Sequence, residues 1–360
     1  MINQLYLFFS IGAFWTSFVL SLLFFFIPVP RIPQLENYKT AKRIMAFAYM
    51  LFCVISMNAI SIGPEEMNLF TFRILILIFA TFQLYTFAHV NISLIESRFL
   101  SIKKLIYHSI PVAILSLLNA GTYRRLWDDN FSNILYYSFL IFYILSVGGT
   151  IILFIKHHRN YKKRFDNYFT GNSRDHLQWV SIASIFISLT GIAVILFCIF
   201  MREVTILFPI LGIAFYIYYA IHFINYTEVF NYMAPIVGEE AEKNVKASSI
   251  TFSQIGNSIR EWEMKKLYLK PDLTISIVAS QISTNRTYLS NFLNTIKEMT
   301  FNEWINGLRI EEAKKIISVD RHVTLDDLCE KTGYSDKSYF SKCFRKYTGT
   351  TVSQWKISLE

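Results

Sequence analysis

Charged side chains are scarce in this 360-residue sequence. They make up 17% of it against 53% hydrophobic residues, a balance too apolar for an ordinary soluble globular protein. There are only four cysteines, with no C-x-x-C pair and no histidine spacing suited to zinc, so neither a disulfide framework nor a metal site is expected. The sequence also lacks a phosphate-binding glycine loop, a kinase motif and a nucleophile with a placed base. We therefore expect no enzyme activity, no catalytic residues and no cofactor.

Long apolar runs fill the first 230 residues instead. A helix that spans a membrane needs about 20 mostly apolar residues. We expect the first run to be retained as a span, because no basic segment precedes it and no small-residue cleavage site follows it. The seven predicted transmembrane helices are residues 4–27, 42–62, 70–93, 103–120, 131–156, 177–201 and 204–226.

The basic residues between these runs predict the topology. The first, third and fifth loops hold thirteen lysines and arginines, whereas the alternate loops hold four. The positive-inside rule then places the N-terminus outside and, after seven crossings, the C-terminus in the cytoplasm. The segment KHHRNYKKRF, Lys156 to Phe165, is interpreted as part of this positive anchor. Polar residues at membrane depth, such as Gln83, His89 and Asn91, are interpreted as side chains satisfied between helices or at the membrane interface.

From about residue 253 the pattern becomes that of amphipathic helices, and one unit occurs twice. The segment Val278 to Trp304 aligns with Leu328 to Trp355 when one residue is inserted at the turn. Each copy predicts a helix, a tight turn and a second helix. Gly333 suits a left-handed turn, and Asn285 and Asp336 are predicted N-caps of the two second helices.

The second helix of each copy carries polar side chains on one side. Arginine, lysine and asparagine pair with base edges, and short hydroxyls reach bases or phosphates. A single polar face is usually just solvated, but the same face twice in the same register favours DNA. Lys342 is the predicted base contact, with Arg345 and Lys346 nearer the phosphates. The predicted DNA-binding residues are Arg286, Thr287, Ser290, Asn291 and Asn294 in the first copy, and Lys337, Ser338, Ser341, Lys342, Arg345 and Lys346 in the second.

The second copy, GYSDKSYFSKCFRKYTG, resembles the signature of the AraC/XylS family of bacterial transcription regulators, and LRIEEAKKII, Leu308 to Ile317, resembles the helix that joins that family's two helix-turn-helix units. The resemblance covers residues 260–356. It implies that one helix of each unit enters successive major grooves about 10 base pairs apart. The sequence departs from the family pattern where Ser283 and Glu298 replace glycines, Cys329 an alanine, Val352 a proline and Asn291 an arginine.

These observations predict an all-α chain in three parts. Residues 1–230 form a seven-helix transmembrane bundle, 231–252 a linker, and 253–360 a cytoplasmic DNA-binding domain with helix-turn-helix units at 273–297 and 324–347. The segment FSQIGNSIREWEMKK is predicted to be an amphipathic helix that either dimerises or docks on the DNA-binding domain.

The predicted function is a membrane-bound one-component transcription regulator of the bacterial inner membrane, controlled by a signal sensed in or across the membrane. The expected partners are double-stranded DNA, the lipid bilayer, RNA polymerase, a second copy of the chain and an unknown signal ligand. One alternative stays open: a transmembrane receptor or transporter whose cytoplasmic tail binds a protein partner rather than DNA. The basic faces on the two second helices argue against this alternative.

Overall fold

The computed structural model is helical, with no strand among the residues it describes, which confirms the predicted all-α class. The chain divides into two compact units. The first unit contains Met1–Arg159 and His176–Glu239, and the second contains Asn160–Asp175 and Glu240–Glu360. The residues described are 2–30, 35–66, 69–97, 99–100, 102–123, 126–170, 177–200, 207–237 and 252–359.

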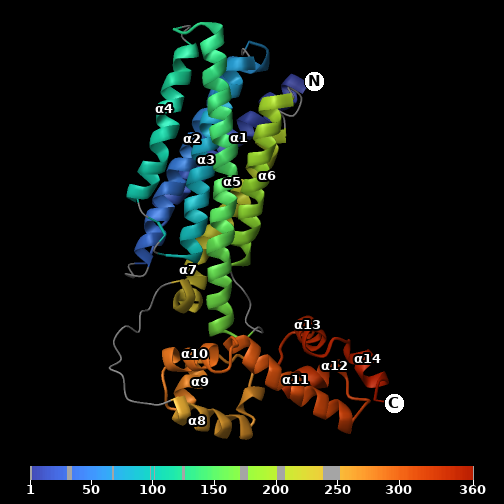
Figure 1. Ribbon diagram of the computed structural model, residues 1–360. Helices are drawn as coiled ribbons and strands as arrows, with labels where there is room; N and C mark the ends of the chain where they lie inside the picture. The colour runs from blue at the N-terminus through green and yellow to red at the C-terminus, as the bar shows by residue number, and fades with distance from the viewer. Residues whose placement is uncertain are drawn as a thin grey trace. The chain divides into compact units, whose positions relative to one another are not determined.

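The first unit consists of long apolar helices that run side by side (Figure 1). Six of them are long and apolar enough to cross a membrane, whereas the apolar stretch of the fourth covers only Leu105–Asn119 among the described residues. Seven crossings therefore remain a prediction. The helices are α1 (Ile2–Phe26), α2 (Glu36–Glu66), α3 (Leu69–Ile95), α4 (Ile102–Tyr123), α5 (Asp129–Tyr168), α6 (Gln178–Phe200) and α7 (Leu207–Val237).

Several polar side chains inside the first unit form hydrogen bonds between helices, and many large apolar side chains face outward. The hydroxyl of Tyr219 donates to Asn91 Oδ1 at 2.8 Å, and Asn91 Nδ2 donates to Ser184 at 3.0 Å. This agrees with the interpretation of Asn91 as a residue satisfied between helices. Such pairing suits an interior without water, where an unpaired polar group costs several kcal/mol, of the order of 2 to 7. Side chains more than half exposed on the outside include Phe8, Phe26, Leu117 and Ile152.

The second unit is built around one long helix, α11 (Phe301–Val319), which contributes to two hydrophobic cores. Figure 1 shows α11 between the group of α8 to α10 and the group of α12 to α14. The other helices are α8 (Phe252–Met264), the 3-10 helix η3 (Leu267–Leu269), α9 (Ile275–Gln281), α10 (Arg286–Thr295), α12 (Leu325–Thr332), α13 (Lys337–Thr348) and α14 (Val352–Ile357).

Equivalent positions of the sequence repeat are buried in the two cores. Leu289 of α10 and Phe340 of α13 are both 0% exposed, and Leu293 and Phe344 are buried as well, one turn later. In each helix-turn-helix, the second helix therefore packs into its core through equivalent apolar residues. The opposite side, which carries the polar residues, is left outside the core.

The turns and caps form as their residues predict. Gly333 has φ 75° at the end of α12, and the side chains of Asn285 and Asp336 accept hydrogen bonds at the starts of α10 and α13. Ser283 and Glu298 also lie in the left-handed region, with φ 56° and 52°. These are two positions at which the resembled family has glycine, so the backbone turn is kept without it.

The helices on either side of the predicted linker are α7 and α8. Helix α7 continues to Val237, inside the predicted linker 231–252, and residues 238–251 lie outside the described residues. Helix α8 packs into the first core of the second unit through Ile255, Ile259 and Trp262. Its apolar side is therefore used for docking within the chain, which is one of the two roles expected for this helix.

Helix α5 is shared by both units. It begins at Asp129 in the first unit, and its residues from Asn160 onward belong to the second. The sequence predicts a span that ends at residue 156 and a basic segment, Lys156 to Phe165, that serves as an anchor. In the structure that segment continues the helix and supplies part of the second unit.

Candidate nucleic-acid interface

The predicted residues of the first copy lie along α10. Its apolar residues Leu289 and Phe292 are buried, so the polar positions between them are directed away from the core. Asn294 Nδ2 donates to Ser290 Oγ at 3.1 Å, which links two of these side chains one turn apart. Thr287, Asn291 and Asn294 are exposed, and Arg286 and Ser290 are half-buried.

Arg286, at the first position of α10, is in contact with the end of α5. Its guanidinium carbon lies 5.6 Å from the ring centroid of Tyr168, within the range of a cation–π interaction. The hydroxyls of Tyr168 and Ser276 of α9 are 3.3 Å apart and hydrogen-bonded. Arg286 is therefore held by a residue from outside the helix-turn-helix unit.

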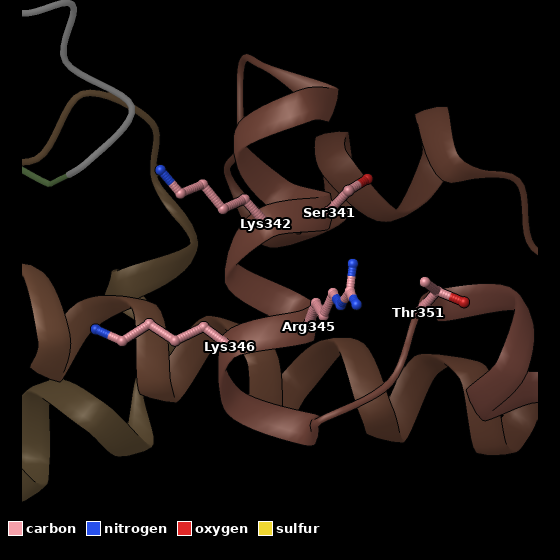
Figure 2. A pocket seen from close by; sticks show the side chains of 5 residues that line it. All are labelled: Ser341, Lys342, Arg345, Lys346 and Thr351. Atoms are coloured by element: carbon pink, nitrogen blue, oxygen red, sulfur yellow. The ribbon is translucent and has the colours of Figure 1, made fainter.

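The predicted residues of the second copy lie along α13. Ser341, Lys342, Arg345 and Lys346 line an open hollow of about 510 Å³ together with Thr351, the N-cap residue of α14. Figure 2 shows Ser341 and Arg345 on the side toward Thr351, whereas Lys342 and Lys346 leave the helix on the other side. The hollow combines cationic and hydroxyl groups, the chemistry that binds phosphate. Lys337 and Ser338, on the first turn, are exposed.

Two of the predicted lysines form ion pairs. Lys337 bonds to Asp326 of α12, and this hydrogen bond raises the pKa of the lysine. Lys346 Nζ lies 3.5 Å from Glu303 Oε1 at the start of α11. The sequence groups Lys346 with Arg345, but in the structure a carboxylate competes for the charge of Lys346, whereas Arg345 has no ion pair among the described residues.

A buried arginine contacts residues of both hydrophobic cores of the second unit. Arg309 of α11 is 0% exposed, and its Nε donates to the Tyr268 carbonyl at 2.8 Å, while Nη2 donates to the Lys270 carbonyl at 2.6 Å. Its guanidinium carbon also lies 5.3 Å from the ring centroid of Tyr334, which is in the turn of the second helix-turn-helix. The backbone that precedes the first helix-turn-helix and a side chain in the turn of the second are thus tied to one residue.

Four residues of this interface were not found from the sequence: Tyr168, Glu303, Asp326 and Thr351. A signal for Tyr168 exists, because aromatic residues recur at Tyr161, Phe165 and Tyr168, the spacing of one helix face. That spacing continues past the predicted membrane boundary. The carboxylates give no comparable signal, because their partners are distant in the sequence.

Residues 278–357 match a family described as a helix-turn-helix domain. The C-terminal part of the chain is an AraC-type helix-turn-helix domain. Similar proteins include the uncharacterized transcriptional regulatory protein YesN of Bacillus subtilis, 30% identical over 88 residues, which are 24% of each chain. An uncharacterized HTH-type transcriptional regulator in the cgkA 5′ region of Pseudoalteromonas carrageenovora is 32% identical over 85 residues, 24% of this chain and 49% of the relative.

A third similar protein is named histidine kinase P4, from Formosa agariphila. It is 24% identical over 117 residues, 32% of this chain but 8% of the kinase. The matched segments thus span less than half of the length of each of these three relatives. No solved structure matches the chain. The similarity supports a DNA-binding regulatory domain and leaves the apolar helices to be interpreted from their own sequence.

Proposed function

We propose that this protein is a membrane-bound one-component transcription regulator. Its AraC-type domain binds a specific DNA site, and its apolar helices hold it in the bacterial inner membrane and sense a signal. The observation that carries the proposal is the pair α10 and α13, two capped helices with buried apolar sides and outward polar sides. The part of the chain that the structure describes also has six helices long and apolar enough to cross a membrane.

In this proposal α10 and α13 enter successive major grooves on one side of the duplex, about 10 base pairs apart. Arg309 fixes their relation, Arg286 and Lys342 contact base edges, and Arg345 with Ser341 binds backbone phosphate. The excess of basic residues in alternate loops supports an N-terminus outside and the DNA-binding domain in the cytoplasm. RNA polymerase, a second copy and a signal ligand are the further partners we propose.

Topology is tested with a reporter that is active only in the cytoplasm. We expect activity when the reporter is fused after Glu360 and none when it is fused at Asp129, which precedes the fifth predicted span. Chromosomal DNA crosslinked to the intact protein should contain a recurring site. A silent reporter after Glu360 would overturn the proposal, since DNA would then be out of reach.

Sequence reading is tested with Lys342→Ala in the full chain. We expect a loss of about 1 to 3 kcal/mol at the best site and a relaxed preference there, the magnitude of a lost base contact. Lys265→Ala is the control, because it removes the same charge just after α8, where Lys265 is paired with Glu261 at 2.6 Å. An unchanged sequence preference in a folded Lys342→Ala protein would contradict base reading by α13, and absence of any preferred duplex would favour a protein-binding tail.

A further inference from the structure

The end of α5 occupies a surface of the DNA-binding domain that includes a predicted DNA contact. Three observations define this surface. The Thr170 backbone N–H donates to the Leu273 carbonyl at 3.3 Å, beside an isolated antiparallel bridge between Phe169 and Thr274. Phe169 is 1% exposed and Thr170 is 0% exposed. The segment is therefore packed into the domain and not merely adjacent to it in the sequence.

The contact reaches the first DNA-binding helix through Tyr168. Its ring packs against the first hydrophobic core, and its face lies 5.6 Å from the guanidinium carbon of Arg286. Arg286 is the first residue of α10, the part of the helix that is closest to base edges in a docked helix-turn-helix unit. A guanidinium that stacks on Tyr168 has to give up this position before it can reach into a groove.

The same segment reaches the second DNA-binding helix through hydrogen bonds. Asn302 Nδ2 of α11 donates to Asp166 Oδ1 of α5 at 3.3 Å. The Tyr339 hydroxyl of α13 donates to Asn302 Oδ1, also at 3.3 Å. One residue thus connects the end of α5 to α13, so that a shift of α5 perturbs contacts at both helices.

We propose that the docked segment 160–170, which is the end of α5 and the two residues after it, withholds Arg286 from DNA and that its release raises DNA affinity. The inference rests on the proposed function, and it adds the segment through which the first unit controls the second. Helix α5 runs from Asp129 to Tyr168 and contributes residues to both units, so it is the element through which this control would pass.

The test compares two substitutions of Tyr168 in the full chain in lipid nanodiscs. Tyr168→Phe keeps the aromatic face and loses only the bond to Ser276, whereas Tyr168→Leu keeps an apolar side chain and loses the face. We expect Tyr168→Leu to bind a duplex about two- to fivefold more tightly, the range for one cation–π contact, and Tyr168→Phe to bind like the unmodified protein. In an Arg286→Ala background, Tyr168→Leu should have no effect on affinity.

A measurement on the unmodified protein avoids any problem of folding. If DNA and α5 compete for Arg286, DNA must weaken the docking by reciprocal linkage. We expect amides of residues 166–170, including the Thr170 N–H bonded to Leu273, to exchange hydrogen faster when DNA is added. Unchanged or slower exchange there overturns the inference.

The outcomes separate this inference from the proposed function. If Arg286→Ala weakens binding while Tyr168→Leu matches Tyr168→Phe, DNA binding stands and the withholding role of α5 is wrong. A gain in Tyr168→Leu that persists in the Arg286→Ala background also contradicts it. If neither the unmodified protein nor any variant binds duplex DNA at low salt, the proposed function itself fails.

Discussion

Glu303→Gln is expected to strengthen DNA binding by releasing Lys346. Glu303 has two roles in the structure: its Oε2 accepts from the backbone N–H and the hydroxyl of Thr300 in a capping box, and its Oε1 lies 3.5 Å from Lys346 Nζ. Glutamine also serves in capping boxes, so the substitution keeps the cap of α11. It removes only the negative charge that competes with DNA phosphate for the lysine.

The magnitude follows from counterion release. Each phosphate neutralised contributes about 0.9 to the slope of log K against log salt concentration. If Lys346 is freed completely, the slope steepens by about 0.9, so that affinity falls about 3.5-fold further between 50 and 200 mM salt. The ion pair itself is weak, about 0 to 1 kcal/mol, because both side chains are largely solvent-accessible, so little folding stability is lost.

The assay is fluorescence anisotropy of a labelled duplex titrated with the full chain in uncharged nanodiscs, repeated over a series of salt concentrations. Glu311→Gln is the matched control: it lies on the same helix, changes the net charge equally, and releases Lys314, its partner at 2.6 Å. Subtracting the control removes the general effect of one added positive charge. Equal slopes for the two variants would refute the assignment of Lys346 to the phosphate backbone.

Two further predictions concern stability. In thermal unfolding, Gly333→Ala should lower the free energy of unfolding by about 2 to 4 kcal/mol, and Gly349→Ala by only about 1. Both glycines have positive φ, but a Cβ at Gly333 would lie 2.2 Å from the Leu269 carbonyl oxygen, whereas a Cβ at Gly349 meets nothing within 4 Å. Equal losses in the two variants would contradict the close packing of Gly333. The second unit should also lose stability in acid. The Thr300 backbone N–H, followed by its hydroxyl, holds the pKa of Glu303 below its usual value, and the Thr324 hydroxyl does the same for the pKa of Asp327. A lowered pKa in the folded state gives stability that is present above the unfolded pKa of about 4, and is lost as pH falls through the folded value. Asp327→Asn should flatten this loss, and an unchanged pH profile in that variant would show that the cap does not contribute.

The parts of the structure that the sequence predicts are local. Asn285, Asp336 and Gly333 act on backbone groups a few residues away, so their residue types suffice to place two starts of helices and one turn. The repeat is also visible, because Leu289 and Phe340 must both face a core for each helix pair to be stable. The outward direction of the polar residues on α10 and α13 then follows from helix periodicity.

The partners of these polar residues could not be predicted, because they depend on tertiary packing. Asp166 and Asn302 are 136 positions apart in the sequence. Helix periodicity does not predict which distant carboxylate or amide contacts a given side chain. For the same reason, the sequence does not show that Lys346 lies beside Glu303, which distinguishes it from its neighbour Arg345. Clusters of charge read from sequence give the sign of a surface but not how much of its charge is available.

The size of the α5 contact limits what the proposed control can achieve. A signal shifts the equilibrium between the docked and released states only by the difference in its affinity for these two states. The two states in turn differ in DNA affinity only through the side chains whose contacts differ between them. The Tyr168–Arg286 contact alone accounts for about a two- to fivefold change. Regulation over a wider range therefore requires the Asp166–Asn302 bond and the buried Phe169 to be released as well, which would alter α13 together with α10. The hydrogen-bond chain through Asn302 makes this joint release the natural consequence of moving one helix, because both DNA-binding helices are connected to the same segment of α5.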